Sequence, residues 1–167
     1  IYADNKIGLR SAATNNNSFE SPAGEKIIKI IDINNDRGVA RTADKIIVLA
    51  RLGEKTEAII ATSFTLNPAT REWLVWSPLE LWSIYERDKP AILNRTSDNI
   101  ASVFPLDDVG ALLVANSQGL TAFNPGYYVS QTLFEGEVRG ASVNQRLKKI
   151  YFLGKVEDKE GLFELEY

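Results

Sequence analysis

The stretch that decides the fold is Ser63–Tyr85, which reads SFTLNPATREWLVWSPLELWSIY. Moved along the chain by 39 positions without a gap, it lies on Ser102–Asn124, which reads SVFPLDDVGALLVANSQGLTAFN. In this register the apolar run Trp73–Trp76 falls on the apolar run Leu112–Ala115. Short apolar runs separated by turn-forming residues predict strands, so the two stretches are copies of one repeating unit made of strands.

A third copy follows the second. Ala141–Val143 repeats Ala101–Val103, and Ile150–Leu153 repeats Leu112–Ala115. A period of about 40 residues that contains several short strands is typical of the blades of a β-propeller. The sequence therefore predicts an all-β protein of β-propeller type with about four blade equivalents, each an antiparallel sheet of four strands.

The blades are assigned from this period. We expect one domain over residues 1–167, with irregular blades in residues 1–60 and regular ones at 61–100, 101–139 and 140–167. The last copy stops after its third strand, so a strand from nearer the N-terminus is expected to complete it, as rings of blades commonly close. Two alternatives stay open: the four blades close by themselves, or they form part of a larger ring.

Apolar residues occupy both alternating faces of Trp73–Trp76, because Trp73 and Val75 share one face and Leu74 and Trp76 the other. A strand of this kind is covered on both sides. We therefore expect Trp73 and Trp76 to lie in the core between blades and not on a surface that stacks sugars or peptides.

The first 60 residues follow the period less closely. The polar segment Thr14–Pro22 predicts an exposed, mobile loop, since it offers little apolar surface to offset its ordering entropy. Only 27 positions separate Ile46 from Trp73, which predicts a blade that lacks a strand or has slipped register. Glu54–Ala61 is long enough for two helical turns, but Ala58–Ala61 also has the pattern of a strand, which favours an all-β class.

Composition excludes several kinds of chemistry. The 167 residues include no Cys and no His, which removes disulfides, thiolate zinc sites, cysteine nucleophiles and His-based triads. The 19 basic and 22 acidic residues are interspersed, so nucleic acid is not an expected partner. The apolar runs are strand-sized, too short for a membrane helix. A chain that begins at Ile1 and has no Met is expected to be the C-terminal part of a longer one.

One segment has the pattern of a cation loop. Asp32, Asn34 and Asp36 place oxygen atoms at alternate positions, as calcium loops do. Gly38 follows one position later than an EF-hand loop requires, and Ala43 stands where the bidentate Glu belongs. The alternative is a polar turn after the strand Ile27–Ile33. No other cofactor is expected.

Tyr127 and Tyr128 follow the turn Asn124–Gly126 and are candidates for contact with a partner. Two carboxylate pairs, Asp107–Asp108 and Glu157–Asp158, are the kind of group that acid–base or glycosidic chemistry requires. Both pairs lie in predicted hairpin turns, where acids are ordinarily solvated.

Two regions also carry a family resemblance. Leu66–Trp76 followed by Glu80–Tyr85 resembles the repeats of WD40-like and TolB-like propellers. Lys148–Lys155 with Glu160–Leu165 is similar to the last blade of large bacterial propeller proteins that carry PEGA repeats near a membrane-anchored N-terminus. The resemblance implies a non-enzymatic, extracytoplasmic bacterial propeller, anchored through upstream sequence and used for binding or assembly.

The functional hypothesis is a non-enzymatic binding or assembly module, whose propeller loops contact a protein, a peptide or a glycan. The alternative is a carboxylate-dependent propeller enzyme of glycosidase or lyase type, which would gather several acids in a concave pocket. A third interpretation is a structural segment without a partner of its own.

Overall fold

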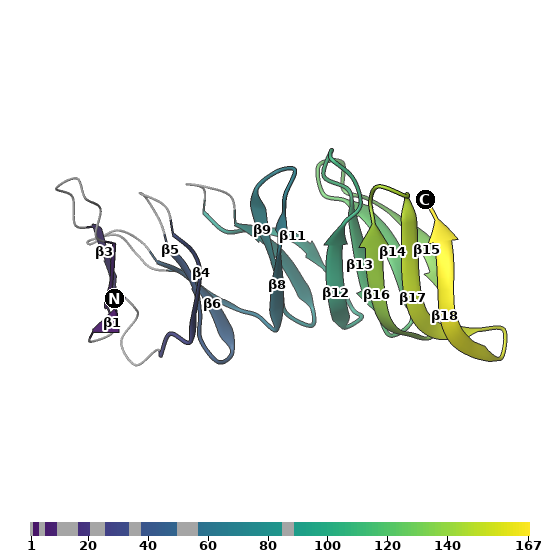
Figure 1. Ribbon diagram of the computed structural model, residues 1–167, viewed down its shortest axis with the longest axis horizontal. Helices are drawn as coiled ribbons and strands as arrows, with labels where there is room; N and C mark the ends of the chain where they lie inside the picture. The colour runs from purple at the N-terminus through teal and green to yellow at the C-terminus, as the bar shows by residue number, and fades with distance from the viewer. Residues whose placement is uncertain are drawn as a thin grey trace. The chain divides into compact units, whose positions relative to one another are not determined.

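The computed structural model of the chain describes residues 2–3, 6–9, 17–20, 26–33, 38–49, 57–84 and 89–167 (Figure 1). Every element in these ranges is a strand, and every strand pair is antiparallel. None of the described residues forms a helix with the length and hydropathy needed to cross a membrane. The chain divides into two compact units, Ile1–Thr62 with Glu86–Pro90 and Ser63–Tyr85 with Ala91–Tyr167.

The first unit contains two sheets. One has the order β1-β2-β3, and the other has the order β4-β5-β6-β7. Their strands are β1 (Tyr2–Ala3), β2 (Lys6–Leu9), β3 (Asn17–Glu20), β4 (Lys29–Ile33), β5 (Gly38–Arg41), β6 (Lys45–Leu49) and β7 (Glu57–Ile60).

Two expectations for this unit are corrected, and the alternative left open at Ala58–Ala61 is decided in favour of a strand. Asn17–Glu20, expected within a loop, is strand β3, because its backbone pairs with β2; the flanking residues 14–16 and 21–22 lie outside the described residues. Ala58–Ile60 belongs to strand β7 and not to a helix. The sheet that contains Ile46 has all four strands. Ile46 lies in the third strand of its sheet, whereas Trp73 lies in the second strand of the next sheet. The spacing of 27 positions is short because these two strands are not equivalent.

The second unit contains three sheets, with the orders β11-β10-β9-β8, β12-β13-β14-β15 and β16-β17-β18. The strands are β8 (Ser63–Asn67), β9 (Glu72–Trp76), β10 (Glu80–Ile84), β11 (Ala91–Arg95), β12 (Ile100–Pro105), β13 (Leu112–Asn116), β14 (Gly119–Asn124), β15 (Val129–Glu135), β16 (Val138–Asn144), β17 (Lys149–Val156) and β18 (Lys159–Glu166).

Apolar side chains on alternating positions hold these three sheets together. One core cluster joins Leu74, Trp76 and Leu81 of the first sheet to one face of the second. The other joins the opposite face of the second sheet, including Leu113 and Leu120, to Ile150 and Phe152 of the third, among others. The strands of the middle sheet therefore need apolar residues on both faces, which is the pattern that the sequence shows.

Neighbouring sheets of the second unit meet at their first strands. The first strand of the middle sheet, β12, packs beside β8 and beside β16. Residues at the ends of β8, β12 and β16 line one pocket, so the turns that follow these three strands lie at the same end of the three sheets. This end of the second unit carries the candidate site.

The last sheet has three strands where its two predecessors have four, as expected from the sequence. In Figure 1, β18 (yellow) follows β16 and β17 at the edge of this sheet. The inner face of the last sheet packs on the middle sheet through Phe152, whose ring centroid lies 4.6 Å from that of Phe134 in β15. Within the last sheet, the ring of Phe152 lies 5.5 Å from that of Phe163.

Candidate binding site

A pocket of about 560 Å³ lies at the end of the second unit where β8, β12 and β16 finish. Three successive sheets contribute to it through their first strands and the turns after them, and Tyr151 of β17 completes the lining. Its lining residues are Leu66, Pro68, Phe104, Pro105, Ser142, Val143, Asn144, Gln145, Arg146 and Tyr151.

Hydrogen bonds fix the turn between β16 and β17 that forms one wall of this pocket. The side-chain amide of Gln145 donates from Nε2 to the carbonyl oxygen of Pro105, at 3.0 Å. The Oδ1 atom of Asn144 accepts from the backbone N–H of Leu147, at 3.1 Å. The bond from Gln145 holds the turn against β12, and the bond to Asn144 stabilises the turn itself.

Arg146 is exposed on the same turn. It makes no hydrogen bond or ion pair with any other described residue, and it is the one charged residue among those that line the pocket. Half of the lining residues have apolar side chains, namely Leu66, Pro68, Phe104, Pro105 and Val143, and Leu66 is 41% exposed to solvent. Apolar side chains next to an unpaired guanidinium suit a ligand that has an apolar group beside a carboxylate.

Tyr127 and Tyr128 lie in the turn between β14 and β15, and each is 80% exposed. Because the strands of this sheet alternate in direction, their turn lies at the same end as the turn between β12 and β13, which borders the pocket. The side chain of Asn124 stabilises the turn by accepting from the N–H of Gly126 at 3.0 Å. The tyrosines are therefore placed where a partner could reach them, and their contact with one stays a prediction.

The tryptophans take structural positions. Trp76 is buried in the cluster between the first two sheets of the second unit. Trp73 is half-buried, and its ring meets that of Phe64 edge to face at 5.8 Å. Neither residue lines the pocket.

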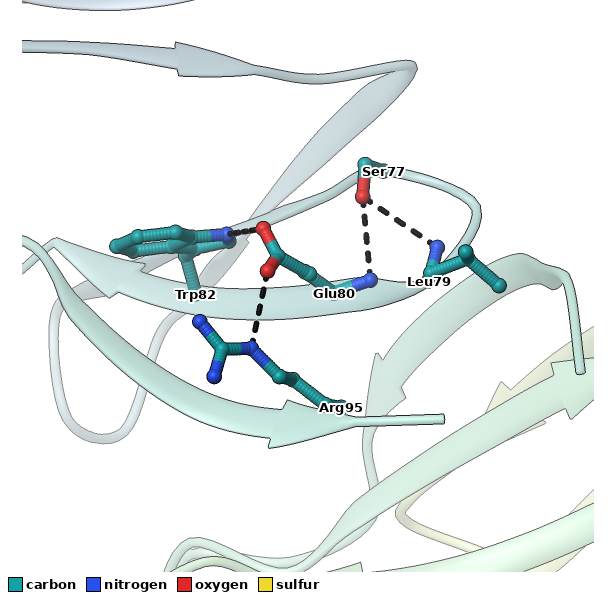
Figure 2. A network of polar contacts seen from close by, with 5 residues as sticks. All are labelled: Ser77, Leu79, Glu80, Trp82 and Arg95. Carbon is teal, nitrogen blue, oxygen red and sulfur yellow. Dashed lines mark hydrogen bonds and ion pairs between the residues drawn. The ribbon is translucent and has the colours of Figure 1, made fainter. Parts of the chain in front are cut away.

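Figure 2 shows a polar network in which the carboxylate of Glu80 binds two groups. One oxygen accepts from Trp82 Nε1 at 3.2 Å, and the other accepts from Arg95 Nε at 3.0 Å. The hydroxyl oxygen of Ser77 accepts from the backbone N–H groups of Leu79 and Glu80. The network connects β11 with the turn that precedes β10. Both carboxylate oxygens of Glu80 are therefore used in structural hydrogen bonds.

The two carboxylate pairs of the sequence are also turn residues. Asp107 Oδ1 accepts from the N–H groups of Val109 and Ala111 at 3.0 and 2.8 Å. Glu157 and Asp158 both have positive φ in the β17–β18 turn, where Asp158 pairs with Lys155 at 3.0 Å. Neither pair lines the pocket, whose described lining includes no carboxylate. The pocket therefore lacks the acids that a glycosidase or lyase mechanism requires.

The calcium prediction stays untested. Asp32 lies in β4 and pairs with Val39 next to an irregularity in the strand register. Asn34 and Asp36 lie outside the described residues. Among the residues that the structure does describe, no three acidic side chains come together as a metal site.

Ion pairs cover the outward face of the last sheet. Lys149 of β17 donates to Glu164 of β18, and this bond lowers the pKa of Glu164 and raises that of Lys149. The hydroxyl of Tyr151 also lowers the pKa of Glu164. At the other end of the sheet, Arg139 pairs with Glu160 at 2.9 Å and lowers the pKa of that carboxyl.

Comparison with known proteins defines the class. No protein-family model matches the chain, and none of the curated proteins matches its sequence. Among solved structures, it is similar to the N-terminal domain of Nup159, with a TM-score of 0.54 and 13% identity over 84% of this chain and 44% of that one. A chain in the S. cerevisiae complex of Dbp5 with Nup159, Gle1, IP6 and ADP has a TM-score of 0.52 and 13% identity, over 98% of this chain and 49% of that one. Hsv2 of Kluyveromyces marxianus has a TM-score of 0.55 and 11% identity, over 99% of this chain and 57% of that one.

These likenesses confirm the predicted fold class: the chain is an all-β protein of the β-propeller type. It spans about half the length of the solved chains that it matches. The finer resemblance to TolB-like and PEGA-associated bacterial propellers, and the extracytoplasmic location and upstream membrane anchor that it implied, stay predictions.

The sequence did not reveal the pocket. Its lining residues come from three repeats and include no motif, and Arg146 is an ordinary exposed turn residue in the sequence. The signal that could have found most of them is positional, because all but Tyr151 lie at the end of the first strand of a repeat or in the turn after it.

Proposed function

We propose that this chain is a protein-binding module, and that it holds a peptide segment of its partner in the pocket formed by β8, β12 and β16. The observation that carries the proposal is the combination of apolar side chains from three sheets with one charged side chain, Arg146, that has no ion-pair partner among the described residues. Such a site favours a peptide with a carboxylate next to an apolar side chain.

The fold supports a role in binding. A structurally similar chain is found in a complex of Dbp5 with Nup159 and Gle1, so propellers of related shape occur in protein assemblies. The exposed Tyr127 and Tyr128 lie at the same end of the middle sheet as the pocket, and tyrosine is enriched at protein interfaces. We infer that they extend the contact with the same partner.

A peptide fits the pocket better than a glycan does. The amide groups of Asn144 and Gln145 already serve the turn, through the bonds to Leu147 and Pro105. The hydroxyls of Ser142 and Tyr151 are the other polar side-chain groups of the lining besides Arg146. A glycan presents many hydroxyls that would need such partners.

Selection from a displayed library of random 12-residue peptides tests this proposal. We expect the purified chain to enrich peptides that have Asp or Glu beside an apolar residue. Arg146→Gln should weaken the binding of an enriched peptide by about tenfold or more in fluorescence polarisation, because a charge-assisted hydrogen bond is lost. The matched control is Arg139→Gln, which removes an arginine whose partners are Glu137 and Glu160.

Two results would overturn the proposal. One is selection that enriches no peptide above a surface without the protein. The other is an enriched peptide that binds Arg146→Gln and the wild-type chain equally well.

A further inference from the structure

Two side chains of the last sheet hold the backbone at the end of β12. Gln145 donates from Nε2 to the carbonyl oxygen of Pro105 at 3.0 Å. The hydroxyl of Tyr167 donates to the carbonyl oxygen of Leu106, the next residue, at 2.6 Å. Phe104 and Pro105, which we call the apolar wall, line the pocket from this same stretch of β12. The last sheet therefore fixes the backbone that carries the apolar wall.

Tyr167 also holds the turn that carries Arg146. Its backbone N–H donates to the carbonyl oxygen of Lys148 at 3.1 Å, and the ammonium group of Lys148 lies 5.6 Å from the centre of its ring. The N–H of Lys148 donates in turn to the carbonyl oxygen of Gln145 at 3.3 Å. The ring of Tyr167 packs on the apolar cluster between the last two sheets. One residue thus joins the turn after β12 to the turn after β16.

The distance between the apolar wall and Arg146 decides which ligands can contact both. Hydrogen bonds to a guanidinium depend steeply on distance and direction, so a carboxylate beside an apolar group must match this spacing. The side chain of Arg146 makes no bond to another described residue that would fix its place. The spacing therefore depends on the backbone of its turn, which Gln145 and Tyr167 anchor to the end of β12.

We propose that Tyr167 is a positioning residue of the binding pocket. By joining the two turns, its hydroxyl sets the place of Arg146 relative to the apolar wall, and with it the affinity for a peptide that has a carboxylate beside an apolar side chain. The inference rests on the proposed function, because Tyr167 does not line the pocket and acts only through the turns. Tyr167→Phe removes the hydroxyl and keeps the ring and the backbone bond to Lys148.

The affinity of an enriched peptide for the wild-type chain and for Tyr167→Phe, measured by fluorescence polarisation, tests the inference. We expect Tyr167→Phe to raise Kd about three- to tenfold, which corresponds to the loss of one hydrogen bond that orients the site. In a chain that already carries Arg146→Gln, it should change Kd by less than about twofold, because the side chain that it positions is absent. A smaller fraction of folded chain would instead act equally in both backgrounds.

The matched control is Thr96→Val. The hydroxyl of Thr96 also donates to a backbone carbonyl, that of Asp98 at 3.2 Å, but it lies in the connection before β12 and does not line the pocket. Its loss should leave Kd unchanged within about twofold. An equal loss of affinity for Thr96→Val, or none for Tyr167→Phe, would overturn this inference and leave the binding proposal in place. Selection that enriches no peptide would overturn both.

Hydrogen exchange of the free chain tests the positioning step without a peptide. The N–H groups of Leu147 and Lys148 are hydrogen-bonded within the turn that carries Arg146. If Tyr167 holds this turn, they should exchange at least about threefold faster in Tyr167→Phe and at the wild-type rate in Thr96→Val. Equal rates in all three chains would contradict the inference, whatever the peptide measurements show.

Discussion

The sheet of β12–β15 and the sheet of β16–β18 place equivalent residues in different surroundings. Leu120 of the middle sheet is fully buried, whereas Leu162, at the same register position of the last sheet, is 68% exposed. The inner faces of the two sheets are alike, since both pack on the preceding sheet through apolar clusters. The difference shows that the repeat places apolar residues at the same position of each sheet in the second unit, and that they are buried where the next sheet of this unit packs on them.

The largest expected effect concerns the covered face. Leu120→Ala should lower the free energy of unfolding by about 2–5 kcal/mol, because it removes buried methyl groups and leaves a cavity between the two sheets. Urea denaturation of the 167-residue chain measures this loss. The control Val109→Ala, in an exposed turn, should change it by no more than about 0.5 kcal/mol. A loss below about 1 kcal/mol for Leu120→Ala would show that the sheets are not packed as described.

A smaller effect concerns the polar link between the same two sheets. The hydroxyl of Tyr167 donates to the carbonyl oxygen of Leu106, at 2.6 Å. Tyr167→Phe should therefore cost about 0.5–1.5 kcal/mol of unfolding free energy at neutral pH.

The cost of Tyr167→Phe should depend on pH. Burial, and next to it the charge of Asp107, raises the pKa of Tyr167 in the folded chain. Because its pKa is raised on folding, Tyr167 contributes fully to the free energy of unfolding below the ordinary tyrosine pKa of about 10. This contribution is lost as pH rises through the pKa of Tyr167 in the folded chain. Denaturation curves at about pH 8 and about pH 11 should show the difference between Tyr167→Phe and wild type shrinking. A difference that grows with pH would contradict the assignment.

The smallest effect concerns the ion pair of Lys149 and Glu164 on the outward face of the last sheet. Lys149→Gln should raise the pKa of Glu164, because the hydrogen bond from Lys149 is the main cause of its lowered pKa. The lowered pKa makes its stabilising contribution present near neutral pH and lost as pH falls through the folded value. NMR titration of the side-chain carboxyl measures the shift, and Lys155→Gln, which removes a partner of Asp158, should leave Glu164 unchanged. Salt should weaken the effect, since Glu164 is exposed to solvent and Lys149 is only half-buried.

The comparison also shows why some features were predictable from sequence. The strands of the second unit follow from alternating apolar positions and turn residues, and the buried Trp76 follows from a strand that is apolar on both faces. Strands β3 and β5 were missed because Asn17–Glu20 and Gly38–Arg41 are short and carry few apolar residues. Their conformation is set by pairing with neighbouring strands and not by their own propensity.

The candidate site was less predictable for a geometric reason. Its residues are brought together by β8, β12 and β16, which are adjacent in space but about 40 residues apart in the chain. Arg146 borders the pocket only through the arrangement of three sheets, which no local sequence pattern predicts. The exposed position of Tyr127 and Tyr128 followed from the turn that precedes them.

The measurement that tests the account most directly is the free energy of unfolding of the 167-residue chain with Leu120→Ala or with Leu162→Ala. Leu120 is fully buried between two sheets, so its substitution should cost about 2–5 kcal/mol, whereas Leu162 is 68% exposed, so its substitution should cost no more than about 0.5 kcal/mol. Equal costs for the two substitutions would contradict the described packing of the three sheets.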